Sequence, residues 1–233
     1  MLPNEVVVDV MNKMPFMKKV YASFYYYYSI EDVIPDDVLY AIDSVFHNIL
    51  IQDFTLKPKF DGYKFREIYD IISQWNSTSL DNALIYRGTS LDYVENLDRD
   101  FYTSGGFFRV IHGDSKFLTF WSYFPASALI FASQASRPVL LVAKYDPKYC
   151  APDNYFSILD EFTGIIDDKP YNHGAIKYLR EMEVRCYKFP VANTKYMLKG
   201  KDLLDLFNMV VPVYRQYMDE EEVERIRKGL EVK

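Results

Sequence analysis

The sequence is poor in the side chains that hold metals and form disulfides. It has only two cysteines and three histidines in 233 residues. Cys150 and Cys186 are far apart and form no CxxC pair, so we expect neither a zinc site nor a disulfide framework. No histidine has a second ligand at metal spacing, and we therefore expect no metal cofactor.

Several familiar motifs are also missing. There is no GxGxxG after a strand, no P-loop, no GxSxG and no HExxH, which excludes the enzyme classes that depend on them. No run of about 18 apolar residues is present, so we expect no transmembrane helix and no membrane partner. The N-terminus carries Glu5 and Asp9 and lacks a continuous apolar stretch, which argues against a signal peptide. The expected location is the cytoplasm.

The charge balance is mildly acidic. The 27 basic and 33 acidic side chains give a net charge of -6, which argues against general electrostatic capture of nucleic acid or anionic membrane. A local basic strip for nucleic acid could be formed by Lys195, Lys199, Lys201 and Arg215. A solvated face explains these residues more simply. Hydrophobic residues make up 49% of the chain, enough for one large domain or a core with a helical appendage.

The first 80 residues are expected to form a mostly helical N-terminal region. A helix is predicted to open at Asp36 and Asp37, and a second places Phe65, Ile72 and Trp75 on one face. Residues 81–233 are expected to form the functional core. No low-complexity linker separates them from the helical region, so the two parts are expected to form one compact unit.

The pattern of predicted secondary structure changes after residue 80. Helices are predicted near 90–97, 125–135 and 219–228, and strands near 83–88, 107–111, 116–121, 138–145 and 209–214. The stretch 146–174 is predicted to be a loop that contains short elements. Helices followed by short strands indicate an α+β fold rather than a repeating βαβ sheet.

Three short signals carry the functional argument. They are Tyr86-Arg87-Gly88 at the end of a strand; Phe117 to Ser122 followed by Pro125, Ala128, Phe131 and Ala132; and Glu181-Met182-Glu183-Val184. Side chains two apart in a strand face the same way, so Glu181 and Glu183 are predicted to share one cleft. Taken alone, the two glutamates also fit an exposed acidic edge.

The order of these signals resembles the mono-ADP-ribosyltransferases of the arginine–serine–glutamate class, which include bacterial exotoxins and bacteriophage enzymes. The resemblance covers roughly Leu84 to Tyr187. It implies an ADP-ribosyltransferase-like core of two β-sheets and an enzyme that is a glycosyltransferase using NAD as substrate. It also fits a toxin or a phage enzyme that modifies proteins of a host cell.

The resemblance assigns roles to individual residues. Glu183 would stabilise the cationic ribose left when nicotinamide departs, and Glu181 would orient an acceptor arginine. Arg87 would clamp the dinucleotide, and Gly88 would let the backbone approach it. Tyr178, five residues before Glu183, would recognise the acceptor protein; a half-buried loop tyrosine is the simpler alternative.

The middle signal departs from the family pattern of serine, threonine and serine. One register places Thr119 at the first serine, and a second, which needs no gap, keeps only Ser122. Either hydroxyl is a candidate to contact the dinucleotide and hold Glu183. Trp121 is predicted to face the core, with a place in the wall of a pocket as the alternative.

The nature of the acceptor remains open at this point. The resemblance implies arginine on a protein, because family members with a glutamate at the place of Glu181 typically modify arginine. Such a carboxylate can orient a guanidinium and take its proton. Nucleic acid is a second acceptor class, and an inactive interaction module with the same fold is a third reading.

Overall fold

The computed structural model describes residues 1–31, 62–97, 99–103, 115–153, 181–216 and 218–231. Side chains of residues 23–31 and 62–69 are not described within the helices that contain them. The helix predicted at Asp36, the strand predicted at 107–111 and Tyr178 therefore lie outside the described residues.

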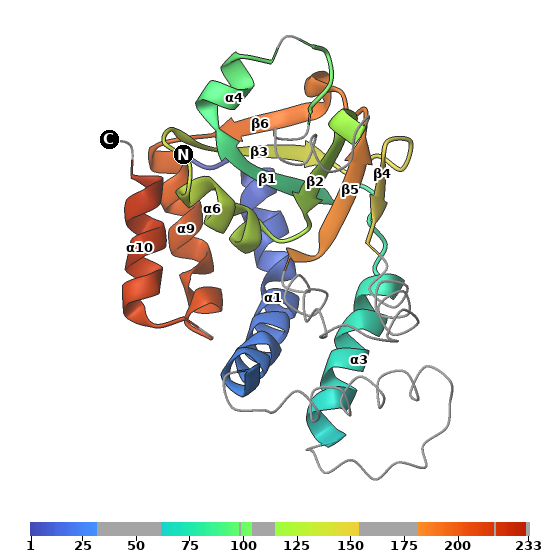
Figure 1. Cartoon of the computed structure of the whole chain (residues 1–233), viewed down its shortest axis with the longest axis vertical. Helices are drawn as coiled ribbons and strands as arrows, with labels where there is room; N and C mark the ends of the chain where they lie inside the picture. The colour runs from blue at the N-terminus through green and yellow to red at the C-terminus, as the bar shows by residue number, and fades with distance from the viewer. Residues whose placement is uncertain (32–61, 98, 104–114, 154–180, 217, 232–233) are drawn as a thin grey trace, which may run out of the picture.

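The described strands form one antiparallel sheet, drawn in Figure 1. Their order across the sheet is β4-β5-β2-β1-β3-β6. The bounds are β1 Leu84–Ser90, β2 Leu118–Ser122, β3 Pro138–Lys144, β4 Cys150–Pro152, β5 Glu183–Tyr187 and β6 Thr194–Leu198. The expected α+β class is confirmed. A division into two separate sheets is not seen among these six strands.

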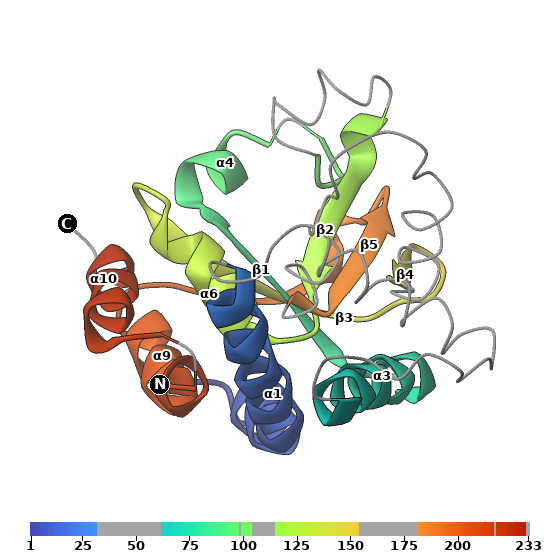
Figure 2. The same ribbon diagram turned by 60° about the horizontal axis from the view of Figure 1, so that its bottom comes forward.

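The sheet is nevertheless almost divided between β1 and β2. Strand β1 pairs with β3 along its whole length, from Leu84 to Ser90. It pairs with β2 at a single position, Tyr86 opposite Ser122. The two strands diverge from that point, as Figure 2 shows. A gap in backbone pairing therefore opens between the second half of β1 and the first half of β2.

A group of helices packs beside this sheet (Figures 1 and 2). They are α1 Asn4–Glu31, α6 Pro125–Ser133, α9 Lys201–Tyr214 and α10 Glu220–Leu230. Helix α6 contacts β1 directly, and α9 and α10 contact α6. A Cβ added at Gly88 would lie 1.9 Å from the carbonyl oxygen of Ala128 and 2.5 Å from the amide nitrogen of Ala132. The glycine is therefore needed for close helix–strand packing.

Helix α1 contributes a buried charged group to the core. The ammonium group of Lys13 donates to the carbonyl oxygen of Leu84 at 2.6 Å and lies 2.8 Å from Asp9 Oδ2. The Tyr86 hydroxyl donates to the same Asp9 oxygen. Burial lowers the pKa of Lys13 to about 8, against the opposing effect of Asp9. These contacts fasten α1 to the first strand of the sheet.

Most elements predicted from the sequence are present in the described residues. Helix α3 spans Gly62–Ser77, and α4 spans Leu91–Glu95 with Ser90 as its N-cap. Short 3₁₀ turns at Ser115–Phe117 and Val191–Asn193 precede β2 and β6. No helix in the described part of the chain is long and apolar enough to cross a membrane.

The strand predicted at 209–214 is wrong, because this segment is the end of helix α9. Its β-branched residues suggested a strand. The buried positions Leu203, Leu206, Val210 and Val213 instead follow helical spacing, and the helix continues through Pro212. Burial of one helix face against α1 and α6 outweighs the local β preference.

Candidate functional site

A pocket of about 190 Å³ lies where β1 and β2 diverge. Its wall is formed by residues of β1, β2, α6 and the segment leading into β5: Tyr86, Arg87, Gly88, Phe120, Trp121, Ser122, Ala128, Phe131, Glu181 and Glu183. Five of the residues singled out in the sequence therefore meet here. Thr119 is not in the wall, and Tyr178 lies outside the described residues.

Ser122 and Thr119 face opposite sides of β2. Ser122 pairs with Glu183 in the β2–β5 register and lines the pocket. Thr119 is buried on the other side, where it donates to the carbonyl oxygen of Cys186 at 3.3 Å and accepts from Trp121 Nε1 at 3.1 Å. Trp121 is 2% exposed, which confirms its prediction as a core side chain.

The two glutamates line the same pocket, as predicted, but the backbone conformation that places them there differs from the prediction. Strand β5 begins at Glu183, so Glu181 lies before the strand and the two-residue alternation does not apply to it. Between them, Met182 has a φ of 41°, a left-handed conformation that is uncommon for a residue other than glycine. A turn, rather than strand geometry, directs both side chains to one pocket.

Strand β2 and the residues after it hold this turn. The Ser122 hydroxyl donates to the carbonyl oxygen of Glu181, and the Tyr123 amide donates to the carbonyl oxygen of Met182 at 3.0 Å. Ser122 Oγ also accepts from the amide of Phe124 at 3.0 Å. The serine hydroxyl therefore holds two backbone segments in place, the turn at Glu181 and the segment at Phe124 that leads into α6.

Glu183 lies in a cluster with an aspartate and an arginine that the sequence analysis did not single out. Arg185 Nε is 3.2 Å from Glu183 Oε1 and 2.6 Å from Asp153 Oδ1. Burial raises the pKa of Glu183 to about 8, and the negative charges of Asp153 and Glu181 act in the same direction. The guanidinium of Arg185 opposes both effects.

Asp153 is placed by backbone contacts as well as by charge. It follows β4 directly, and its amide donates to the carbonyl oxygen of Glu183 at 2.9 Å. Trp75 Nε1 of α3 donates to the Asp153 carbonyl oxygen at 2.8 Å. Burial raises the pKa of its carboxyl group, although Arg185 lowers it. No sequence motif marks Asp153, whereas strand alternation from Glu183 would have identified Arg185.

A disulfide joins Cys150 of β4 to Cys186 of β5, contrary to the expectation from the sequence. The two cysteines are 36 residues apart in the chain but directly opposite in the antiparallel ladder. Sequence spacing does not reveal such a pair, because the pairing of β4 with β5 brings the residues together. The bond lies beside the cluster of Asp153, Glu183 and Arg185.

Arg87 supplies positive charge on the opposite wall. Its Nη1 donates to the carbonyl oxygen of Phe120 at 3.1 Å, across the gap between β1 and β2. Its Nε is buried and has no hydrogen-bond partner among the described residues. Within the same residues no carboxylate lies at ion-pair distance from this guanidinium. Burial lowers the pKa of Arg87, but an arginine stays charged in proteins.

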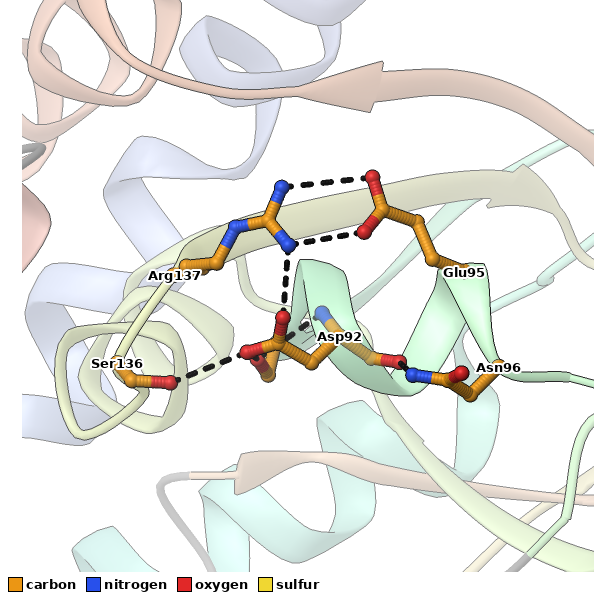
Figure 3. Close-up of polar contacts among 6 residues, drawn as sticks. Asp92, Glu95, Asn96, Ser136 and Arg137 are labelled. Carbon is orange, nitrogen blue, oxygen red and sulfur yellow. Dashed lines mark hydrogen bonds and ion pairs between the residues drawn. The ribbon is translucent and has the colours of Figure 1, made fainter.

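Helix α4 holds an aromatic ring against Arg87. The guanidinium carbon of Arg87 is 5.6 Å from the centre of the Tyr93 ring, and the Tyr93 hydroxyl donates to the carbonyl oxygen of Thr103 at 2.5 Å. Arg137, just before β3, forms ion pairs with two carboxylates of this helix, as Figure 3 shows. Its Nη1 lies 2.7 Å from Asp92 Oδ1 and 2.8 Å from Glu95 Oε2. Such exposed ion pairs add little stability, so their main effect is to orient α4.

No group of three or more His, Cys, Asp or Glu side chains suited to a metal ion occurs in the part of the chain that the structure describes. The residues that line the pocket instead include two carboxylates, one guanidinium and the hydroxyl-bearing Tyr86 and Ser122. This set suits a ligand that carries both anionic and cationic groups.

Comparison with known proteins finds one viral protein of similar length. Uncharacterized protein 67 of Sulfolobus islandicus filamentous virus (isolate Iceland/Hveragerdi) is 29% identical over 222 residues, which cover 90% of this chain and 97% of that protein. No family model matches the sequence. No solved structure matches the chain. The similarity to the viral protein extends well beyond the segment from Leu84 to Tyr187.

Proposed function

We propose that this chain is a mono-ADP-ribosyltransferase of the arginine–serine–glutamate class. It would cleave NAD at the bond between nicotinamide and ribose and transfer ADP-ribose to arginine on a protein. One observation carries the proposal. Arg87, Ser122 and the two glutamates come from three separate segments of the chain and line the same pocket.

The near-division of the sheet supports the fold that this function requires. In the proposed fold, two β-sheets meet at the NAD cleft. Here β1, β3 and β6 are linked to β2, β5 and β4 through one residue pair, Tyr86 and Ser122. The pocket opens beside that pair, between the diverging parts of the two strands.

Arg87 suits the diphosphate of NAD. Its planar guanidinium can donate two parallel hydrogen bonds to phosphate oxygens. The buried Nε that lacks a partner among the described residues is a donor for which a bound ligand would compensate. Phe120 and Tyr93 hold the side chain at the wall of the pocket, so little conformational freedom is lost on binding.

The pocket volume of about 190 Å³ is below the roughly 300–1,000 Å³ typical of sites for drug-sized ligands. The described residues therefore suit the nicotinamide and its ribose, with the remainder of the dinucleotide extending outside this pocket. The apolar side chains of Phe120 and Phe131 form part of the wall. They would exclude water from the bond that breaks.

Glu183 would stabilise the transition state. Departure of neutral nicotinamide leaves positive charge on the ribose, as in glycoside cleavage. A fixed carboxylate interacts more strongly with this cation than with the ground state, which is the source of catalysis. Because the pKa of Glu183 is raised, we expect the rate of NAD cleavage to increase with pH as this group loses its proton.

Glu181 would act on the acceptor. A guanidinium is a poor nucleophile until a neighbouring base orients it and removes a proton. Glu181 lines the same pocket and is partly exposed, so an acceptor side chain can reach it. The similar protein belongs to a virus, which supports the viral setting proposed for this enzyme.

Release of nicotinamide from NAD by the purified chain tests the proposal. Glu183→Gln should abolish both NAD hydrolysis and transfer to protein. Glu181→Gln should abolish transfer and leave slow hydrolysis. As a matched control, Glu224→Gln removes a carboxylate from α10 and should change neither rate.

The acceptor is identified with labelled NAD and a cell lysate. Protease should destroy the labelled product and nuclease should not; the reverse result would assign a nucleic-acid acceptor. A chain that releases no nicotinamide under any condition would contradict the proposed activity and leave an interaction module as the explanation.

A further inference from the structure

Two carboxyl groups and one guanidinium form a compact cluster behind the pocket wall. Arg185 contacts Asp153 at two oxygens, from Nε at 2.6 Å and from Nη2 at 3.0 Å. The same Nε is 3.2 Å from Glu183 Oε1. Arg185 therefore bridges the two carboxyl groups: its Nε donates to Glu183 Oε1, and its Nη2 donates to Asp153 Oδ2.

The cluster is arranged with the guanidinium outside and the carboxyl groups inside. The side chain of Arg185 is 48% exposed, whereas those of Asp153 and Glu183 are 9% and 16% exposed. Glu183 belongs to the pocket wall, but Asp153 and Arg185 do not. Asp153 would therefore influence the chemistry without touching the substrate.

The backbone keeps this arrangement in place. The amide of Asp153 donates to the carbonyl oxygen of Glu183, and the Trp75 indole binds the carbonyl oxygen of Asp153. The disulfide between Cys150 and Cys186 joins the two strands that carry the cluster. Neither carboxyl group can move away from the other without breaking several contacts.

We propose that Asp153 is a positioning residue that acts on Glu183, both through Arg185 and through its own neighbouring carboxyl group, to set the orientation and the charge of Glu183. The inference rests on the proposed function, in which Glu183 is the catalytic carboxylate. Asp153 shares the guanidinium with Glu183, so Arg185 orients Glu183 without neutralising it fully. Once Glu183 has lost its proton, its carboxylate therefore keeps negative charge to offer to a cationic ribose.

The charged groups around Glu183 give this arrangement a definite pH signature. Asp153 and Glu181 place negative charge near its carboxyl group, Arg185 places positive charge there, and Arg87 lies on the opposite wall of the pocket. Removing the charge of Asp153 leaves Arg185 to pair with Glu183 alone, which favours the carboxylate. Removing Arg185 leaves two neighbouring carboxyl groups that repel, which favours the protonated acid.

The test compares Asp153→Asn with Arg185→Gln. The first change should move the pH midpoint for kcat of NAD cleavage downwards, and the second should move it upwards, each by about one pH unit, the scale expected for a charge within 4–6 Å. Arg185→Lys keeps the charge and should restore a midpoint close to that of the unchanged protein. Arg227→Gln, which removes a surface guanidinium on α10, is the matched control and should leave the midpoint in place.

A second measurement does not depend on activity. The carboxyl group of Glu183 can be titrated by NMR in protein carrying ¹³C-labelled glutamate, with Glu183→Gln used to assign its signal. Opposite movements of this titration in Asp153→Asn and Arg185→Gln support the inference even if no NAD is cleaved, and that combined result would refute only the proposed function. Midpoints that stay fixed, or that move in the same direction, overturn the inference.

Loss of folding is separated from loss of positioning by Asp153→Glu. This variant keeps the negative charge, so its titration should remain near that of the unchanged protein. If a folded Asp153→Glu protein has the same Glu183 midpoint as Asp153→Asn, charge at this position does not act on Glu183 and the inference is wrong. Thermal unfolding followed by circular dichroism establishes that each variant is folded.

Discussion

Ser122 lies opposite Glu183 in the β2–β5 ladder, and its hydroxyl donates to the main-chain carbonyl oxygen of Glu181. The serine therefore acts on the turn that carries the two glutamates, at the point where Met182 adopts a left-handed conformation. In the proposed enzyme, the hydroxyl would preserve the geometry of the catalytic pair through the backbone.

Ser122→Ala should reduce NAD cleavage by at least about tenfold, because a displacement of about 1 Å in a catalytic group can cost about a hundredfold in rate. Loss of the buried hydrogen bonds to Glu181 and Phe124 should also lower the free energy of unfolding by about 1–3 kcal/mol. Steady-state kinetics and urea unfolding measure the two effects.

Thr119→Val is the matched comparison, because Thr119 has its hydroxyl on the opposite face of β2. The variant should lose stability on a similar scale while its kcat stays close to that of the unchanged protein. Loss of activity in Thr119→Val together with full activity in Ser122→Ala would contradict the role given to Ser122 and favour the other register.

Gly88→Ala should destabilise the fold. The new Cβ would lie 1.9 Å from the carbonyl oxygen of Ala128, so α6 must move away from β1. Overpacking of this kind costs about 1–3 kcal/mol, and more where backbone atoms are in the way. A lower midpoint of thermal unfolding is expected; Gln134→Ala, at the exposed end of α6, should leave it nearly unchanged. An undiminished midpoint in Gly88→Ala would mean that α6 is not held this close to β1.

Arg87→Lys should weaken NAD binding more than it slows the chemical step. A lysine keeps the charge but loses the planar fork and its contact with Tyr93. Loss of a charge-assisted hydrogen bond, worth about 1.5–3 kcal/mol, corresponds to roughly a 10–100-fold rise in KM. Initial rates over a range of NAD concentrations give this value. An unchanged KM would exclude Arg87 from the NAD site.

The raised pKa of Glu183 links its protonation to stability. In the unfolded chain this group would titrate near 4.5, whereas burial in the native state raises its pKa to about 8. Between these pH values the native state holds a proton that the unfolded chain has released. Stability should therefore fall as pH rises across this window, by up to about 1.4 kcal/mol per pH unit from this group.

Glu183→Gln provides the measurement, because glutamine cannot titrate. The difference in unfolding free energy between the variant and the unchanged protein should shift in favour of the variant as pH rises from 5 to 8. Urea unfolding at several pH values follows this difference. A difference that does not vary with pH would show that Glu183 titrates normally in the native state.

The sequence predicts the elements whose signals are local. Ser90 before α4, Pro125 at the start of α6 and the apolar run of β3 all lie where the sequence patterns indicated. The residues of the pocket were also identified, because each belongs to a short motif at a strand end. Their common location follows from the pairing of β1, β2 and β5, which no single motif specifies.

The remaining features depend on contacts between distant segments. Asp153 joins Glu183 only because β4 pairs with β5, and the same pairing brings Cys150 and Cys186 together. The sequence predicts strand geometry around Met182. The turn found there has a left-handed residue, and no glycine or asparagine at that position indicates it. Residues 209–214 show the converse effect, in which helix packing overrides a β-branched sequence.

The disulfide makes the carboxyl cluster responsive to the thiol–disulfide balance of its surroundings. Strand β4 has three residues and pairs with β5 at the edge of the described sheet, so its position depends strongly on the covalent link at Cys150. In a compartment that keeps thiols reduced, Asp153 would be held by hydrogen bonds alone. We expect dithiothreitol, or Cys150→Ser, to alter the pH profile of NAD cleavage as Asp153→Asn does. An identical profile in both redox states would show that β4 keeps its place without the covalent link.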